Sequence, residues 1–213
     1  YSQFDISDNM TASVQFTYTQ VKATNQNAQV PMTAEPSAGP QWQIPISADS
    51  VFNVFNEDIS HWRYRSVPFG ARKNDYDNDI FGARFSLEGN FEMNDGTYFW
   101  SVGYQVNDAS YDQTGYNYIN LANLRNAVGP SFQRSDGSFG CGTPDATIVG
   151  CTPLNVFGGP DMGLSAGVIT PNVYDQMVSY VGYTLAGQSG FDSEDFWAEI
   201  SGPMFEMPYG TAY

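Results

Sequence analysis

The sequence predicts an all-β fold: an antiparallel, up-and-down segment of a transmembrane β-barrel with long extracellular loops and short periplasmic turns. Three observations lead to this prediction. Two adjacent runs, 80–91 and 98–107, alternate between apolar and mostly polar residues, as strands with one solvent-exposed face do. Both are as long as the ~9–11 residues of a membrane-spanning strand, whereas ~5–6 residues are common in soluble proteins. Short turns also alternate with long irregular segments, which places all short turns at one end of the sheet.

The two runs form a predicted β-hairpin. From Phe81 to Phe91, every second residue is apolar or glycine, and the same holds from Tyr98 to Val106. The Asn94-Asp95-Gly96 cluster between them contains residues that tolerate positive φ, as a tight connection requires. The apolar face of such a hairpin needs either another sheet or lipid against it. Strand length favours lipid.

Two more strands are predicted before the hairpin. Phe4 and Ile6 alternate with polar residues, Asp8-Asn9 forms a turn, and alternation resumes over 11–19. Residues 23–79 are then expected to form a long loop, rich at first in Gln, Asn, Pro and Ala and without periodicity. Within it we interpret 62–71 as a β excursion, because a full spanning strand there would place the next short turn at the wrong end.

A second long loop, 109–190, contains both cysteines and two helix signals. Asn120 is the expected N-cap of a short helix that ends at Ala127, and Thr170-Pro171 begins a helix that leads to Val181.

Strand character returns over 196–204, and Pro208-Tyr209-Gly210 turns the chain towards a further strand. We therefore expect one partial β-barrel domain over 1–213, with about five strands and the start of a sixth.

Composition excludes several classes of function. Eight Lys and Arg stand against 23 Asp and Glu, and the net charge of -15 would repel a phosphate backbone, so we expect no nucleic-acid partner. No apolar run approaches the ~18 residues of a membrane-spanning helix, and no leader precedes Tyr1, which starts abruptly in alternation as a fragment would. A mean hydropathy of -0.35 is compatible with a barrel, whose apolar residues alternate with polar ones.

The single histidine is far from any glycine-flanked serine, so we expect no enzyme.

Cys141 and Cys151 are predicted to form a disulfide. Closing this short loop would stabilise the fold by roughly 2–3 kcal/mol in the chain-entropy picture, in an oxidising compartment. A metal site would need further Cys or His at ligand spacing, and His61 is distant in sequence, so none is expected.

Asp75, Asp77 and Asp79 have the spacing of the first three calcium ligands, at positions 1, 3 and 5, of an EF-hand loop. Ile80 and Ser86 stand where that loop needs glycine and a bidentate glutamate, so an EF-hand is excluded and no cofactor is expected. A looser, loop-bound calcium site remains an alternative to a simple solvated loop end.

The candidate ligand-binding residues are Trp62, Arg63, Tyr64 and Arg65, in the first long loop. Guanidinium groups pair well with carboxylates, so this cluster is suited to an anionic ligand such as a metal-chelating siderophore. The alternative, which we favour, is that these arginines form salt bridges to neighbouring acidic loops.

Several sequence segments resemble segments of TonB-dependent outer-membrane receptors. Similar to their extracellular loops are YINLANLRNAVGPSF at 118–132, CGTP at 141–144, CTPLNVFGG at 151–159 and ITP at 169–171. AEISGPMFEMPYG at 198–210 resembles a barrel strand with its periplasmic turn, and 5–18 resembles an early barrel hairpin.

This resemblance implies a location in the bacterial outer membrane and uptake of a scarce ligand: siderophore-iron, cobalamin or a glycan. The implied partners are membrane lipid, the remainder of the receptor chain with its plug, and the TonB complex acting through that plug. Such receptors close about 22 strands around the plug, and even the smallest membrane barrels use about eight. Neither plug nor TonB box is visible, so a segment of a receptor is expected. The alternatives are an extracellular self-assembling or adhesive structural β-protein and a soluble carbohydrate-binding sandwich.

Overall fold

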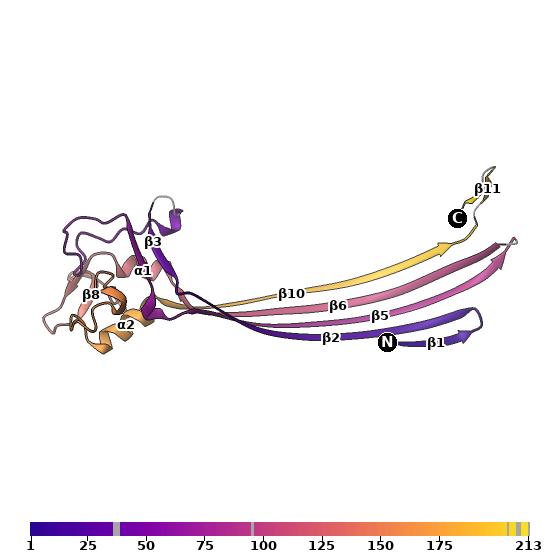
Figure 1. Ribbon diagram of the computed structural model, residues 1–213, viewed down its shortest axis with the longest axis horizontal. Coiled ribbons are helices and arrows are strands. Elements are labelled where there is room, and N and C mark those ends of the chain that lie inside the picture. Colours follow the sequence, from indigo (N-terminus) through magenta and orange to yellow (C-terminus); the bar gives the residue numbers. More distant parts are fainter. Residues whose placement is uncertain (36–38, 95, 204, 208–209, 213) are drawn as a thin grey trace. The chain divides into compact units, whose positions relative to one another are not determined.

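The computed structural model describes residues 1–35, 39–94, 96–203, 205–207 and 210–212. Within these residues the main element is a five-stranded sheet in the order β1-β2-β5-β6-β10, so that strands adjacent in the sheet also follow one another in the chain (Figure 1). Its strands are β1 (Ser2–Ser7), β2 (Met10–Asn27), β5 (Arg72–Met93), β6 (Gly96–Ile119) and β10 (Gly182–Ser201). The predicted all-β, antiparallel class is confirmed. Over the described residues the sheet is open, with β1 and β10 at its edges and no closed barrel.

The chain divides into two compact units, which are described separately. The first, called the sheet unit, comprises Tyr1–Ala23, Tyr76–Gln113 and Gly187–Tyr213. The second, called the loop unit, comprises Thr24–Asp75 and Thr114–Ala186.

The strands extend further than the sequence predicts, which corrects the loop boundaries. The loops expected over 23–79 and 109–190 shrink to the segments 28–71 and 120–181 between strands. Over 72–79 and 108–119, polar side chains and tyrosines occur on both faces. Backbone hydrogen bonds hold such strands together without any apolar alternation. Periodicity therefore marks only the part of a strand that has one apolar face.

Two of the three short turns lie where the sequence predicts them. β1 pairs with β2 across Asp8-Asn9, with Ser7 beside Met10. Asn94 has a φ of 50°, as expected for the β5–β6 turn, while Asp95 lies outside the described residues. Met204, the predicted end of the fifth strand, and the predicted turn residues Pro208 and Tyr209 also lie outside them. The segments that flank this turn, β11 (Phe205–Met207) and β12 (Gly210–Ala212), pair antiparallel.

The loop unit has an apolar core of its own. Around it lie α1 (Leu121–Ala127), α2 (Pro171–Val181), the pair β3 (Pro31–Ala34) and β4 (Trp62–Arg65), the sheet β7 (Ser131–Gln133), β8 (Phe139–Thr143) and β9 (Ala146–Ile148), and the 3₁₀ helices η2 (Pro40–Trp42), η3 (Val67–Phe69) and η4 (Gly159–Asp161). Its buried side chains include Met32, Ile44, Ile46, Leu124, Val128, Leu154, Met162, Met177 and Val181. Among the described residues no helix is both long enough and apolar enough to cross a membrane.

Both helix starts are confirmed, whereas the β excursion predicted over 62–71 is a strand only over Trp62–Arg65 and is followed by the 3₁₀ helix Val67–Phe69. The Asn120 side chain accepts hydrogen bonds from the backbone N–H groups of Ala122 and Asn123 at 3.0 and 3.1 Å. Thr170 caps α2 through the N–H of Val173. The excursion is β4, which pairs with β3 rather than with the main sheet.

The predicted disulfide is also confirmed. Cys141 on β8 is bonded to Cys151, with 5.7 Å between the two Cα atoms. Both cysteines are buried.

Candidate functional site

The sheet unit carries a continuous apolar face that is exposed. A shallow groove of about 390 Å³ runs along it, and Phe196 at its side is 75% exposed. The apolar residues that line this groove are Phe4, Ala12, Val14, Phe85, Leu87, Val102, Tyr104 and Phe196. An exposed apolar patch that extends over several strands marks a surface that contacts a partner or lipid.

This apolar face ends abruptly in hydrogen-bonded acidic groups. On β5, strand alternation places Asp77 and Asp79 on the same side as Phe81. The Tyr18 hydroxyl donates to Asp79 at 2.6 Å, and the Lys22 ammonium to Asp77 at 2.7 Å. Asp77 and Asp79, two of the three carboxylates at the predicted loop end, are therefore paired across strands β2 and β5.

The opposite end of the apolar face is also bounded by a tyrosine. The Tyr98 ring stacks on Phe91, with 5.4 Å between ring centroids. Its hydroxyl donates to the Pro203 carbonyl at 2.7 Å. Tyrosine hydroxyls therefore bond polar groups at both ends of the face, while the rings lie along it.

The other face of the sheet is polar. The hydroxyls of Ser13 and Ser86 are 2.6 Å apart across β2 and β5, and Asn107 on β6 donates to Ser193 on β10 at 3.1 Å. These side chains tie neighbouring strands together by hydrogen bonds instead of apolar contacts.

A cation–π contact also lies on this polar face. The Arg84 guanidinium lies 4.6 Å from the centre of the Trp197 ring. A Cβ atom at Gly103 would lie 2.0 Å from that ring. Glycine at position 103 therefore allows the indole to lie against β6.

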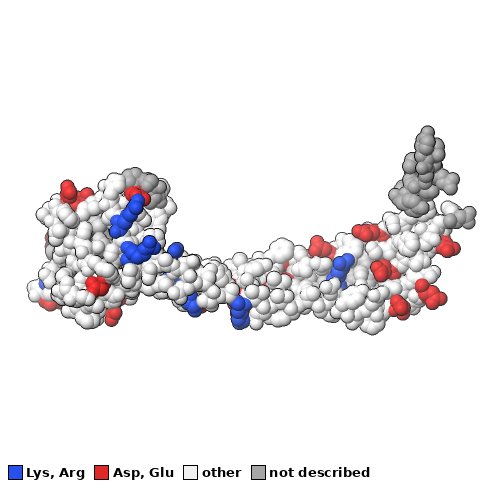
Figure 2. Space-filling view, viewed as in Figure 1, with Lys and Arg blue, Asp and Glu red and all other residues white. Residues whose placement is uncertain are grey.

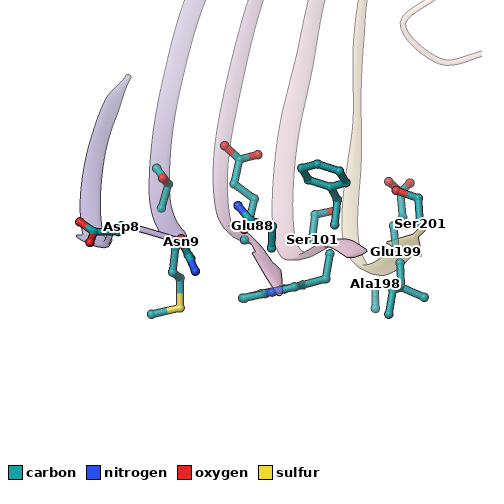
Figure 3. Close-up of a pocket in the computed structure, with 14 residues that line it drawn as sticks. Asp8, Asn9, Glu88, Ser101, Ala198, Glu199 and Ser201 are labelled. Atoms are coloured by element: carbon teal, nitrogen blue, oxygen red, sulfur yellow. The ribbon is translucent and has the colours of Figure 1, made fainter. Parts of the chain in front are cut away.

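A wide groove of about 780 Å³ lies near the short turns of the sheet (Figure 3). Glu88 on β5 and Glu199 on β10 project to the same side of the sheet, whereas Ala198 points away (Figure 3). Over the residues that the structure describes, no three His, Cys, Asp or Glu side chains are grouped as a metal ion would require. Loop-bound calcium stays a hypothesis.

The structure does not bring the four predicted ligand-binding residues together. Trp62 and Tyr64 pack on the core of the loop unit. The Trp62 indole donates to the Ile44 carbonyl at 2.8 Å, and the Tyr64 hydroxyl to the Gly159 carbonyl at 3.2 Å. Burial raises the pKa of Tyr64 to about 12. Trp62 and Tyr64 therefore contribute to the packing of the loop unit.

The two arginines point the other way, because successive residues of a strand face opposite sides. Arg63 pairs with Glu35 at 2.9 Å, as the salt-bridge alternative expects. Arg65 donates to the Gln29 carbonyl at 3.1 Å. Figure 2 shows Lys and Arg side chains gathered on one part of the loop unit, amid a mostly uncharged surface.

A further groove, of about 410 Å³, contains residues that the sequence reasoning missed. It lies on β5, β6 and β10 within the sheet unit and is lined by Tyr76, Asn78, Tyr111, Gln113, Gly187 and Ser189, among others. All six fall inside the predicted loops 23–79 and 109–190. Continuing the alternation of the hairpin strands beyond Ile80 and Asn107 would have placed both tyrosines on the polar face.

Comparison with models of known protein families, with curated proteins and with solved structures gave no significant match to this chain.

Proposed function

We propose that the sheet unit is part of the wall of an outer-membrane β-barrel that belongs to a TonB-dependent receptor, and that the receptor takes up siderophore-iron, cobalamin or a glycan. The observation that carries this proposal is the exposed apolar band on one face of an antiparallel sheet whose other face is polar. Lipid on the outside and water in the lumen would satisfy both faces.

The height of the apolar band supports lipid contact. From Phe81 to Phe91, β5 rises roughly 33 Å at about 3.3 Å per residue, which becomes about 25 Å if the strand is tilted by about 40°. An apolar band of about 25 Å is typical of outer-membrane barrels. The tyrosines at both ends of the band match the aromatic girdles of such barrels.

The oblique course of the band also supports a tilted barrel wall. Outward-facing residues turn from apolar to acidic between Phe81 and Asp79 on β5, but between Val106 and Asp108 on β6. Since Gly82 lies beside Asn107, we infer that Val106 lies beside Ala83. The boundary therefore moves by about two residues from β5 to β6, so the apolar band crosses the strands obliquely, as it would in a wall of tilted strands.

The open edges of the sheet need partners. Unpaired backbone groups at β1 and β10 would be costly in lipid, and the described strands are too few to enclose a lumen. In this proposal, other strands of the same receptor pair with both edges, and its plug couples transport to the TonB complex. The loop unit would then be extracellular.

Open edges favour a second candidate function as well. An extracellular self-assembling or adhesive β-protein could use β1 and β10 to add further copies of itself. Its apolar faces would then pack on each other and not on lipid.

Mass and location of the intact polypeptide separate these candidates. A denaturing gel of outer-membrane fractions, with mass spectrometry of peptides that flank Tyr1 and Tyr213, should give a chain several times heavier than 23.5 kDa. A polypeptide of this size in soluble or filamentous material would overturn the receptor proposal.

A further inference from the structure

The groove on the polar face of β5, β6 and β10 has the form of a small-molecule site. Its volume of about 410 Å³ falls within the range of about 300–1,000 Å³ that is usual for such sites. Tyr111 on β6 is 41% exposed, so part of its ring is accessible. At Gly187 on β10, an added Cβ would meet no atom within 4 Å, and the missing side chain leaves this part of the groove open.

The side chains of this groove match the surface of a sugar. A pyranose has an apolar C–H face, which packs on aromatic rings, and a rim of hydroxyls that both donate and accept hydrogen bonds. Tyr76 and Tyr111 supply rings. Asn78 supplies an amide, with a donor and an acceptor, and Ser189 supplies a hydroxyl.

Charge argues against an anionic chelate at this position. The described residues that line the groove include neither Lys nor Arg, and Asp112 at its margin is acidic. An anionic ligand would need guanidinium or ammonium groups, because these pair with carboxylates. A neutral polyhydroxylated ligand carries no such requirement.

We propose that this groove binds a neutral saccharide. The inference rests on the proposed receptor function, of which it names the ligand class. Both tyrosines hold the sugar rings, while Asn78 and Ser189 select the hydroxyl pattern.

Calorimetric titration of the intact outer-membrane polypeptide, purified in detergent, tests this proposal. The probes are maltohexaose, cellohexaose, xylohexaose and galactohexaose, with ferric citrate as the anionic comparison. At least one hexaose is expected to bind with a dissociation constant below about 1 mM, and to bind more tightly than ferric citrate. If no hexaose binds at about 10 mM, where such an affinity would give near saturation, the proposal is overturned.

Variants locate the binding. Tyr76→Ala and Tyr111→Ala should each raise the dissociation constant of the hexaose by about tenfold. Tyr111→Phe keeps the ring, so its dissociation constant should stay close to that of the wild type. Phe99→Ala is the matched control, since it removes an exposed aromatic ring from the same face of the same strand outside this groove. Equal losses in Phe99→Ala and Tyr111→Ala would place the sugar elsewhere and refute the site. Circular dichroism establishes that each variant is folded.

The outcomes also separate this inference from the receptor proposal. A polypeptide found in the outer membrane that binds no hexaose keeps the receptor proposal and loses the saccharide site. Hexaose binding that depends on Tyr111, in a polypeptide found outside membranes, keeps the site and refutes the receptor.

Discussion

The two units of this chain handle apolar side chains in opposite ways. In the loop unit, Leu124 and Met177 are 0% exposed and belong to one packed core. In the sheet unit, Phe16 is 60% exposed and Phe196 is 75% exposed. Among the described residues of the sheet unit, the buried hydrophobic side chains are Ala83 and Ala109. One unit covers its apolar surface internally, and the other presents that surface outward.

This difference indicates what each unit needs in order to fold. Burial of apolar surface contributes about 25 cal/mol per Å², and the loop unit obtains this within its own chain. Over its described residues, the sheet unit has long hydrogen-bonded strands but no second layer over its apolar face. Its stability should therefore depend on the surrounding medium, whereas that of the loop unit should not.

Leu124→Ala should give the largest effect and should be confined to the loop unit. Removing a fully buried leucine usually costs about 2–5 kcal/mol, because a cavity remains. Hydrogen exchange followed by mass spectrometry should show faster exchange in α1 and α2 peptides, in detergent and in lipid alike. Val149→Ala, at a side chain that is 94% exposed, is the control and should leave exchange unchanged. Equally faster exchange in β2 and β5 peptides would mean that the two units unfold together.

Leu87→Arg should have the next largest effect, and only where lipid is present. Leu87 lies midway along the apolar band of β5, where an arginine facing lipid costs about 2–4 kcal/mol. Glu88→Arg places an arginine one residue away, at an exposed position of the polar face, and should be tolerated. The measurement is the folded fraction in lipid vesicles across a urea series. If the two variants fold equally well, this face does not contact lipid.

The sequence predicted the parts of the fold that local chemistry determines. Phe81 to Phe91 could be assigned because its apolar face gives a period of two. Asn120 and Thr170 could be assigned as helix caps because their side chains satisfy free N–H groups at the first turn. Cys141 and Cys151 could be paired because nothing else in the chain offered them a partner.

The remaining features depend on contacts that lie far apart in the sequence. Residues 72–79 carry no apolar alternation, so their strand is visible only through pairing with β2, as in the Lys22–Asp77 bridge. The groove at Tyr76 and Tyr111 was missed for the same reason. Trp62 and Arg63 formed a plausible ligand cluster in sequence, but a strand turns neighbours to opposite sides. The Trp62 indole packs on a core that includes Ile44, and its N–H donates to the Ile44 carbonyl, 18 positions away in the chain.

Removal of the disulfide should give the smallest effect and should sharpen the contrast between the units. Cys141 and Cys151 are ten positions apart, and opening this loop should cost roughly 2–3 kcal/mol in the chain-entropy picture. The double variant Cys141→Ala/Cys151→Ala should exchange hydrogen faster in β7, β8 and β9 peptides, and dithiothreitol should reproduce this in the wild type. The folded fraction of the sheet unit in vesicles should stay constant, because its strands lie outside the closed loop. A drop in that fraction as large as that for Leu87→Arg would show that the sheet unit relies on the loop unit, and the contrast between them would fail.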